Sequence, residues 1–211
     1  FALWWMGVQS AEVKLSNRIQ SAVVSNTYPT IFGWHTQRDD ELAFMFQLSS
    51  NGLRLVPSHL AGNFSFHSKL PSTGIKQKPV SSHPTLDPQG IYLTFTLSDG
   101  DQLMMMHTGE LGNWYSPKRG RIAFNWETQP LLAELAPALL EKYIDTPTDN
   151  DFLIAGPSGA GYIVPPLAPL LENYTNETVR ICEMVGIDVV TTYVADPPAR
   201  ISRALATKRG G

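Results

Sequence analysis

The sequence predicts an α/β domain with a mainly parallel sheet, of the βα-barrel (TIM) type but incomplete, with about seven strands. Short apolar runs alternate with segments of helical spacing, which is typical of βαβ units. Several of these runs are continuously apolar, as expected for parallel strands that are buried on both faces. A complete eightfold barrel usually needs about 250 residues. The chain has 211 residues, so we expect fewer strands than a complete barrel has.

The expected strands are short and rich in aliphatic, aromatic and β-branched residues. The clearest of them is the run IYLTFTL. The helices expected between the strands carry apolar residues on one side, and Pro137 must kink or restart the third helix. We expect strands at 2–8, 30–34, 53–56, 91–97, 122–126, 152–155 and 188–193, and helices at 11–26, 39–51, 130–145 and 167–185.

The composition excludes several classes of protein. Hydrophobic residues make up 43% of the chain and charged residues 17%, which excludes a disordered chain and a coiled coil. The net charge of −3 argues against a nucleic-acid-binding groove, because such a groove needs a basic field. No apolar run approaches the roughly 20 residues of a membrane-spanning helix. Cys182 is the single cysteine, which excludes an internal disulfide.

We expect one domain over residues 1–198, followed by a basic C-terminal tail at 199–211. The chain starts inside an apolar run at Phe1, without an initiator methionine or a signal peptide. We therefore interpret it as a piece of a longer protein. The segment 70–90 is rich in Pro, Ser and Lys and has no periodicity, so we expect a surface insertion there.

Polar and aromatic side chains follow several of the expected strands. In a parallel α/β sheet the ligand site lies beyond the carboxyl ends of the strands. Carboxylates bind hydroxyl groups and form acid–base pairs, and aromatic rings pack against the apolar face of a sugar. The pattern therefore favours a carbohydrate ligand. The expected ligand contacts are Trp34, His35, Ser58, Asn63, Trp126, Ser158 and Tyr162, and Glu41 is a further carboxylate after the second strand.

The turn that follows the run at 91–97 has the sequence Ser-Asp-Gly-Asp. Gly100 permits a tight turn that projects Asp99 and Asp101 from the end of the strand. The two carboxylates could be an acid–base pair, ligands for sugar hydroxyls or ligands for a hard metal ion. The alternative is an ordinary Asp-Gly turn in which Asp101 caps the next helix.

The glycine-rich segment 156–162 resembles two known motifs only in part. A nucleophile elbow would need a histidine after Ser158, and the last histidine is His107. A dinucleotide fingerprint would need a third glycine. The segment is therefore either a turn that presents backbone N–H groups and the Tyr162 hydroxyl to a ligand, or a turn in which Tyr162 packs in the core. The histidines form no metal signature, so we expect neither a metal nor a cofactor.

The heptad GAGYIVP at 159–165 resembles the GxGYxYP motif, and further blocks between residues 30 and 165 follow the family's order. The chain is thus similar to the C-terminal domain of the GxGYxYP family, whose members are named as glycoside hydrolases. The resemblance implies a βα-barrel-like domain, a glycan ligand, a preceding N-terminal domain and an extracellular or periplasmic location. Two residues depart from the family pattern: Val164 replaces the second tyrosine of the motif, and Gln102 replaces an asparagine.

These observations together predict a carbohydrate-active hydrolase that acts on glycosidic bonds. Asp99 and Asp101 are the expected acid–base pair, or one of them pairs with Glu41. One alternative is a glycan-binding domain that uses the same residues without cleaving the sugar. Another is a metal-dependent polysaccharide deacetylase, because Thr94-Phe95 before the turn resembles part of a deacetylase motif. A deacetylase would need a histidine pair after the turn, and only His107 follows.

Overall fold

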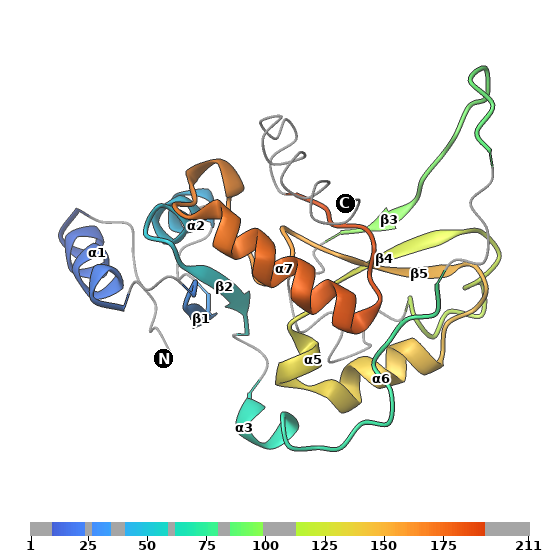
Figure 1. Cartoon of the computed structure of the whole chain (residues 1–211), viewed down its shortest axis with the longest axis horizontal. Helices are drawn as coiled ribbons and strands as arrows, with labels where there is room; N and C mark the ends of the chain where they lie inside the picture. The colour runs from blue at the N-terminus through green and yellow to red at the C-terminus, as the bar shows by residue number, and fades with distance from the viewer. Residues whose placement is uncertain are drawn as a thin grey trace.

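The strands lie in two separate parallel sheets (Figure 1). The first sheet pairs β1 (Thr30–Gly33) with β2 (Arg54–Pro57). The second has the order β3–β4–β5, with β3 (Thr96–Leu97), β4 (Phe124–Thr128) and β5 (Asp151–Ala155). This computed structural model describes residues 10–23, 27–34, 41–58, 62–79, 85–98 and 113–192.

The first sheet is a βαβ unit in which α2 (Glu41–Ser50) connects the two strands. A crossover helix of this kind lets consecutive strands run parallel. Met45 and Leu48 of α2 are completely buried together with Leu53 and Leu55 of the β2 segment. This apolar cluster holds the helix against the sheet.

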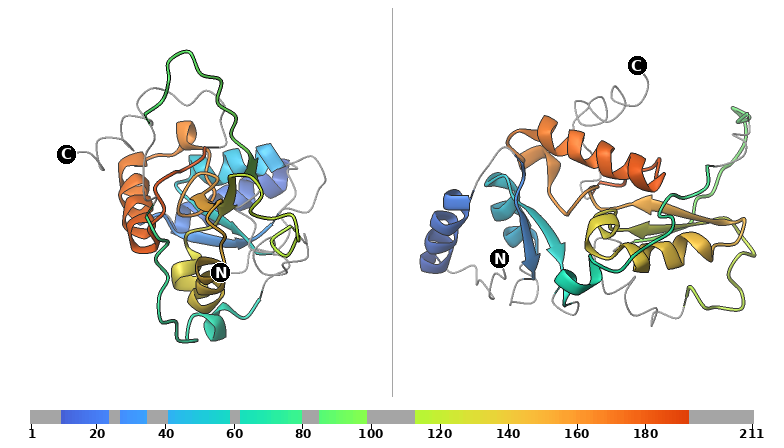
Figure 2. Two further views of the ribbon diagram at one scale, coloured as in Figure 1. Left: turned by 90° about the vertical axis from the view of Figure 1, so that its right-hand side faces the viewer. Right: turned by 60° about the horizontal axis from the view of Figure 1, so that its bottom comes forward.

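The second sheet has helices on different sides of its three strands (Figure 2). The pair α5 (Leu132–Leu135) and α6 (Pro137–Asp145) connects β4 to β5, and α7 (Leu171–Val185) follows β5. Pro137 is the first residue of α6, so the predicted restart at this proline is confirmed. None of the helices in the described part of the chain is long and apolar enough to cross a membrane. The remaining helical segments are α1 (Ser10–Val23), α3 (Phe64–His67) and the 3₁₀ helix η1 (Pro165–Leu167).

The prediction of a βα-barrel of the TIM type is wrong. Among the residues that the structure describes, the sheets hold two and three strands and do not close into a barrel. Where the two sheets approach each other, Tyr162 forms an antiparallel bridge with Leu55. This is one isolated bridge outside the named strands, so it does not join the two ladders into one sheet. The parallel direction that the alternation predicted is found in each of the strand pairs.

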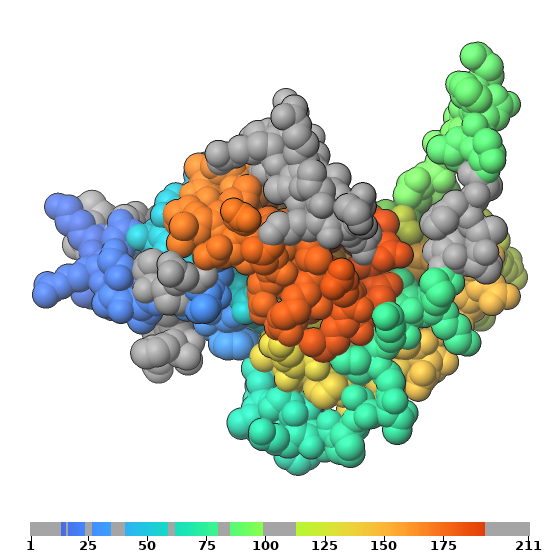
Figure 3. Space-filling model, in the orientation of Figure 1, coloured from blue at the N-terminus to red at the C-terminus, as the bar shows by residue number. Residues whose placement is uncertain are grey.

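The segment 85–98 (the arm) explains part of this difference. It projects away from the body of the molecule (Figure 3), and within the described residues only its β3 portion pairs with another strand. Ile91 is 93% exposed and Leu93 is 79% exposed. The run with the clearest strand signal therefore contributes a short edge strand instead of a long central one.

Two other strands were expected near the ends of the chain. The expected strand at 2–8 lies outside the described residues. The segment expected as the last strand, 188–193, contributes an isolated parallel bridge between Val190 and Ala155 at the edge of β5.

Candidate functional site

The carboxyl end of the β3–β4–β5 sheet is the candidate site. Leu97, the last residue of β3, lies opposite the residue that precedes Glu127 in β4. The chain therefore leaves β3 at Ser98 beside Glu127. Asp99 and Asp101, the carboxylates with the strongest signal in the sequence, follow Ser98 directly but lie outside the described residues.

Glu127 is a buried acidic residue at this end of β4. It is 7% exposed, and its Oε1 accepts a hydrogen bond of 2.7 Å from the Thr191 hydroxyl. Gly156 of the neighbouring segment lies against the carboxyl group. A Cβ atom on Gly156 would come within 2.8 Å of the Glu127 carboxyl carbon. A glycine is therefore required for the carboxyl group to occupy this position.

Gln129 follows Glu127 by two residues, directly after the end of β4. It is completely buried. Its Oε1 accepts hydrogen bonds from the backbone N–H groups of Gly161 at 3.0 Å and of Leu131 at 3.3 Å. Among the described residues, neither its Nε2 nor the Oγ1 of the buried Thr128 has a hydrogen-bond partner. Such groups are rare in folded proteins and each needs an explanation.

The two glycines of the GAGYIVP heptad allow a tightly packed turn. Gly159 has φ +121° and Gly161 has φ +92°, conformations that side chains disfavour. A Cβ on Gly159 would lie 2.4 Å from the Thr178 methyl carbon, and one on Gly161 would lie 2.8 Å from the Arg54 Cδ. Arg54 of β2 also donates a hydrogen bond of 3.1 Å to the Ala160 carbonyl. The turn therefore joins the second sheet to the first.

Tyr162 and Glu41, two of the predicted site residues, lie together. The Tyr162 hydroxyl donates a hydrogen bond of 3.0 Å to Glu41 Oε1, and the tyrosine is 1% exposed. Its backbone exchanges hydrogen bonds of 2.7 and 2.9 Å with Leu55. Glu41 begins α2, where a negative charge is favourable next to the helix N-terminus. The pair links the glycine-rich turn to α2.

Two further predicted contacts lie in the protein interior. Ser158 is 3% exposed, and its hydroxyl donates a hydrogen bond of 2.9 Å to the Ile163 carbonyl. Trp126 is 8% exposed, and its indole N–H donates a hydrogen bond of 2.9 Å to Asp151. Both side chains stabilise the fold around the second sheet. Their contact with a ligand stays a prediction.

The remaining predicted contacts are placed near the first sheet. Trp34 packs edge-on against Phe44 with ring centroids 6.5 Å apart. Ser58 follows β2 and is partly exposed, and Asn63 is exposed and precedes α3 with φ +62°. His35 lies outside the described residues.

The amino end of the same sheet contains a second buried carboxylate, Asp151. It forms an ion pair of 2.7 Å with Arg119. It also accepts hydrogen bonds from the Thr148 N–H and hydroxyl and from the Trp126 indole. Burial alone would raise the pKa of the Asp151 carboxyl, but these hydrogen bonds and the Arg119 charge together lower it below the ordinary value.

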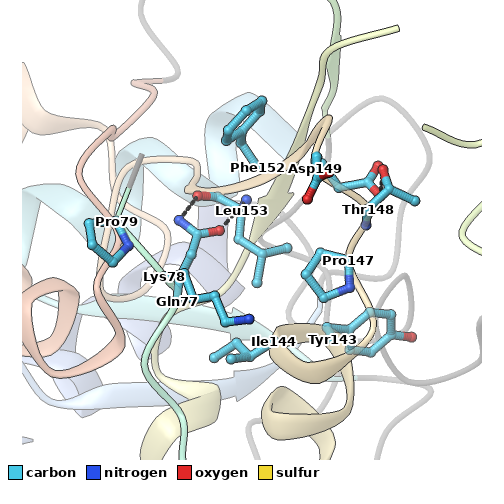
Figure 4. A pocket seen from close by; sticks show the side chains of 11 residues that line it. Gln77, Lys78, Pro79, Tyr143, Ile144, Pro147, Thr148, Asp149, Phe152 and Leu153 are labelled. Atoms are coloured by element: carbon cyan, nitrogen blue, oxygen red, sulfur yellow. Dashed lines mark hydrogen bonds between the residues drawn. The ribbon is translucent and has the colours of Figure 1, made fainter. Parts of the chain in front are cut away.

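A pocket of about 520 Å³ lies beside this amino end. One wall comes from the segment of Gln77 and Lys78, and the other from the turn of Thr148 and Asp149 (Figure 4). The Gln77 carboxamide donates to the Leu153 carbonyl at 3.2 Å and accepts from its N–H at 2.7 Å, so it covers the edge of β5. The pocket and the candidate site are therefore at opposite ends of the strands.

The described residues contain no group of three or more His, Cys, Asp or Glu side chains that could hold a metal ion. Glu127 directly follows the strand expected at 122–126, but no local pattern distinguishes it from other acidic residues. Gln129 carried no signal, because a glutamine has the same local pattern whether it is exposed or buried. The sequence pattern that could have indicated Glu127 and Gln129 is a pair of polar residues at the end of one expected strand, together with Gly156 after the next expected strand.

Comparisons with known proteins agree on the family. Residues 1–69 match the model of the "GxGYxYP third domain", and residues 89–207 match that of the "GxGYxYP putative glycoside hydrolase C-terminal domain". A crystal structure of a putative hydrolase from Bacteroides thetaiotaomicron VPI-5482 is similar, with a TM-score of 0.84 and 22% identity. The similarity covers 95% of this chain and 40% of that one, and it shows the fold alone. No curated protein matches this chain.

Proposed function

Because the chain belongs to the GxGYxYP family, we propose that it is part of a carbohydrate-active hydrolase that cleaves glycosidic bonds. Such a reaction needs two carboxyl groups and a water molecule. One carboxylic acid donates its proton to the glycosidic oxygen as the bond to the anomeric carbon breaks. The other accepts a proton from the water whose oxygen bonds to that carbon, or first forms a covalent intermediate with it.

Asp99 and Asp101 are the proposed carboxyl pair, with Glu41 as the alternative partner for either. The observation that carries this proposal is the register of β3 and β4. It brings Ser98, the start of the Asp-Gly-Asp turn, beside Glu127 at the carboxyl end of the sheet. Parallel α/β sheets hold their ligands at this end.

The proposal is tested by assaying Asp99→Asn and Asp101→Asn on a panel of polysaccharides and p-nitrophenyl glycosides. Loss of a reacting carboxyl group lowers the rate by at least about 100-fold. Asp145→Asn is the matched control, because Asp145 is exposed at the end of α6. Unchanged activity in both Asp99→Asn and Asp101→Asn would overturn the assignment of these residues.

A glycan-binding domain without catalysis is the second candidate. The observation that favours it is the bond between Glu41 and Tyr162, which gives this carboxylate a structural role. Glycan-array binding without release of a product would support it. The deacetylase alternative predicts bound Zn²⁺, Co²⁺ or Ni²⁺ in the purified protein, which metal analysis can detect.

The ligand, the preceding domain and the location of the protein also stay proposals. A carbohydrate partner, a further domain before the segment that matches the family's third domain, and an extracellular or periplasmic location are expected from the family. The single domain over 1–198 and the tail at 199–211 likewise stay predictions. The tail lies outside the described residues.

A further inference from the structure

We propose that Glu127 is the second carboxyl group of the hydrolytic site and works with Asp99 or Asp101 in place of Glu41. This inference rests on the proposed function and names a residue for it. Glu127 either donates the proton to the glycosidic oxygen or accepts the proton from water, and the aspartate from the turn after β3 does the other.

The first support is the position of Glu127 in the sheet. β4 is the central strand of the order β3–β4–β5, and Glu127 is near its carboxyl end. Ser98, which precedes Asp99 in the sequence, leaves the adjacent strand beside it. Glu41 belongs to α2 beside the other sheet and accepts the Tyr162 hydroxyl. Glu127 is thus a described carboxylate on the strand that pairs with β3.

The second support is that two segments, besides β4 itself, surround this carboxyl group. The Thr191 hydroxyl donates to Glu127 at 2.7 Å, and Thr191 is itself fixed by a backbone hydrogen bond of 2.8 Å to Ala155. Gly156 supplies a backbone without a side chain at the point where a Cβ would meet the carboxyl group. A carboxyl group that is oriented from several sides meets a requirement of a reacting group.

The third support is independent of the carboxylates. Gln129 follows Glu127 by two residues, directly after the end of β4. It is completely buried, and its Nε2 has no hydrogen-bond partner among the described residues. A sugar hydroxyl can both donate and accept hydrogen bonds. A carboxylate that accepts them and an amide that donates them can therefore bind neighbouring hydroxyls. The unpartnered amide therefore indicates a polar ligand at this point.

The experiment measures kcat/KM of the whole chain for the p-nitrophenyl glycosides and polysaccharides of the panel. We expect Glu127→Gln to lower kcat/KM by at least about 100-fold, with KM little changed. Glu41→Gln should cause a much smaller loss. Glu183→Gln is the matched control, because Glu183 is exposed on α7. Thermal unfolding of each variant shows whether the fold is retained.

A second variant separates a reacting role from a structural one. Added formate should restore part of the activity of Glu127→Ala, because a small carboxylate can replace the missing group; a structural defect would not respond. Equal activity of Glu127→Gln and wild type, with either Asp99→Asn or Asp101→Asn inactive, would overturn the inference and leave the proposed function. If the wild type cleaves no member of the panel, the proposed function and the inference both fail. Formate rescue supports the inference even if Glu127→Gln folds poorly.

Discussion

Asp151 and Glu127 are buried acids of the same sheet, but they are at opposite ends of it. Asp151 begins β5 and is surrounded by donors that hold the fold: an arginine, a threonine and a tryptophan. Glu127 lies near the end of β4, where a glycine makes room for its carboxyl group and a buried amide nearby has a donor without a described partner. Burial alone therefore does not identify the role of a carboxylate, whereas the groups around it do.

The same difference appears in the pocket at the amino end. Asp151 lines this pocket, but its side chain is 0% exposed and its oxygens accept hydrogen bonds from neighbouring residues. A ligand there would meet Lys78 and Asp149 instead. The chemistry expected from the family therefore fits the carboxyl end of the strands better than the pocket at the amino end.

The largest expected effect is on folding at the amino end. Asp151→Ala leaves the Arg119 charge without its partner and should lower the free energy of unfolding by about 3 kcal/mol. Urea denaturation measures this loss. The matched control is Asp149→Ala, two positions earlier and exposed, which should change the free energy by less than about 0.5 kcal/mol. A loss below about 1 kcal/mol for Asp151→Ala would show that the ion pair does not hold the sheet.

The next largest effect on stability is expected at the carboxyl end of the second sheet. The new methyl group of Gly156→Ala would lie 2.1 Å from the Thr191 Oγ1 and 2.8 Å from the Glu127 carboxyl carbon. Overpacking should cost about 2 kcal/mol of stability and should displace the Glu127 carboxyl group. Gly62→Ala is the control, because no atom lies within 4 Å of a Cβ there. Wild-type stability of Gly156→Ala in thermal unfolding would contradict the close packing.

A smaller effect is expected at the joint between the two sheets. Tyr162→Phe removes the hydrogen bond to Glu41 and should lower the free energy of unfolding by about 1 kcal/mol. A double-mutant cycle with Glu41→Gln measures the coupling of the two side chains. Additive losses would mean that the pair does not connect the turn to α2.

The smallest expected effect is the pH dependence of folding stability that Asp151 contributes. Its folded-state pKa is below the ordinary value of 3.8, so its stabilisation is present above that value and is lost as the pH falls through the lowered pKa. The stability difference between wild type and Asp151→Asn should therefore shrink as the pH is lowered from 5 toward about 2. A difference that stays constant over this range would contradict the lowered pKa.

Local patterns in the sequence predicted the elements that depend on local interactions. The parallel direction of the strands and the restart at Pro137 are confirmed. The predicted barrel is wrong, because the length of a strand depends on the strands that pair with it. The run 91–97 has strong strand propensity, yet within the described residues it pairs only over Thr96–Leu97. No local pattern shows which distant segment lies beside it.

The candidate site was predictable to a similar extent. The convergence of Glu41 and Tyr162 follows from their expected places after two strands, and the structure joins them. The placement of Glu127 and Gln129 depends on burial and on the approach of the Gly156 and Gly161 backbones, which follow β5. Those contacts arise from tertiary packing, which a single sequence does not display.

The central claim is that the carboxyl end of β3 and β4 binds the substrate. It is tested most directly by a crystal structure of the chain with a sugar from the panel that it cleaves or binds. We expect the sugar within hydrogen-bond distance of Glu127 and of Asp99 or Asp101. A sugar bound at the amino end, in the pocket between Lys78 and Asp149, would contradict the account.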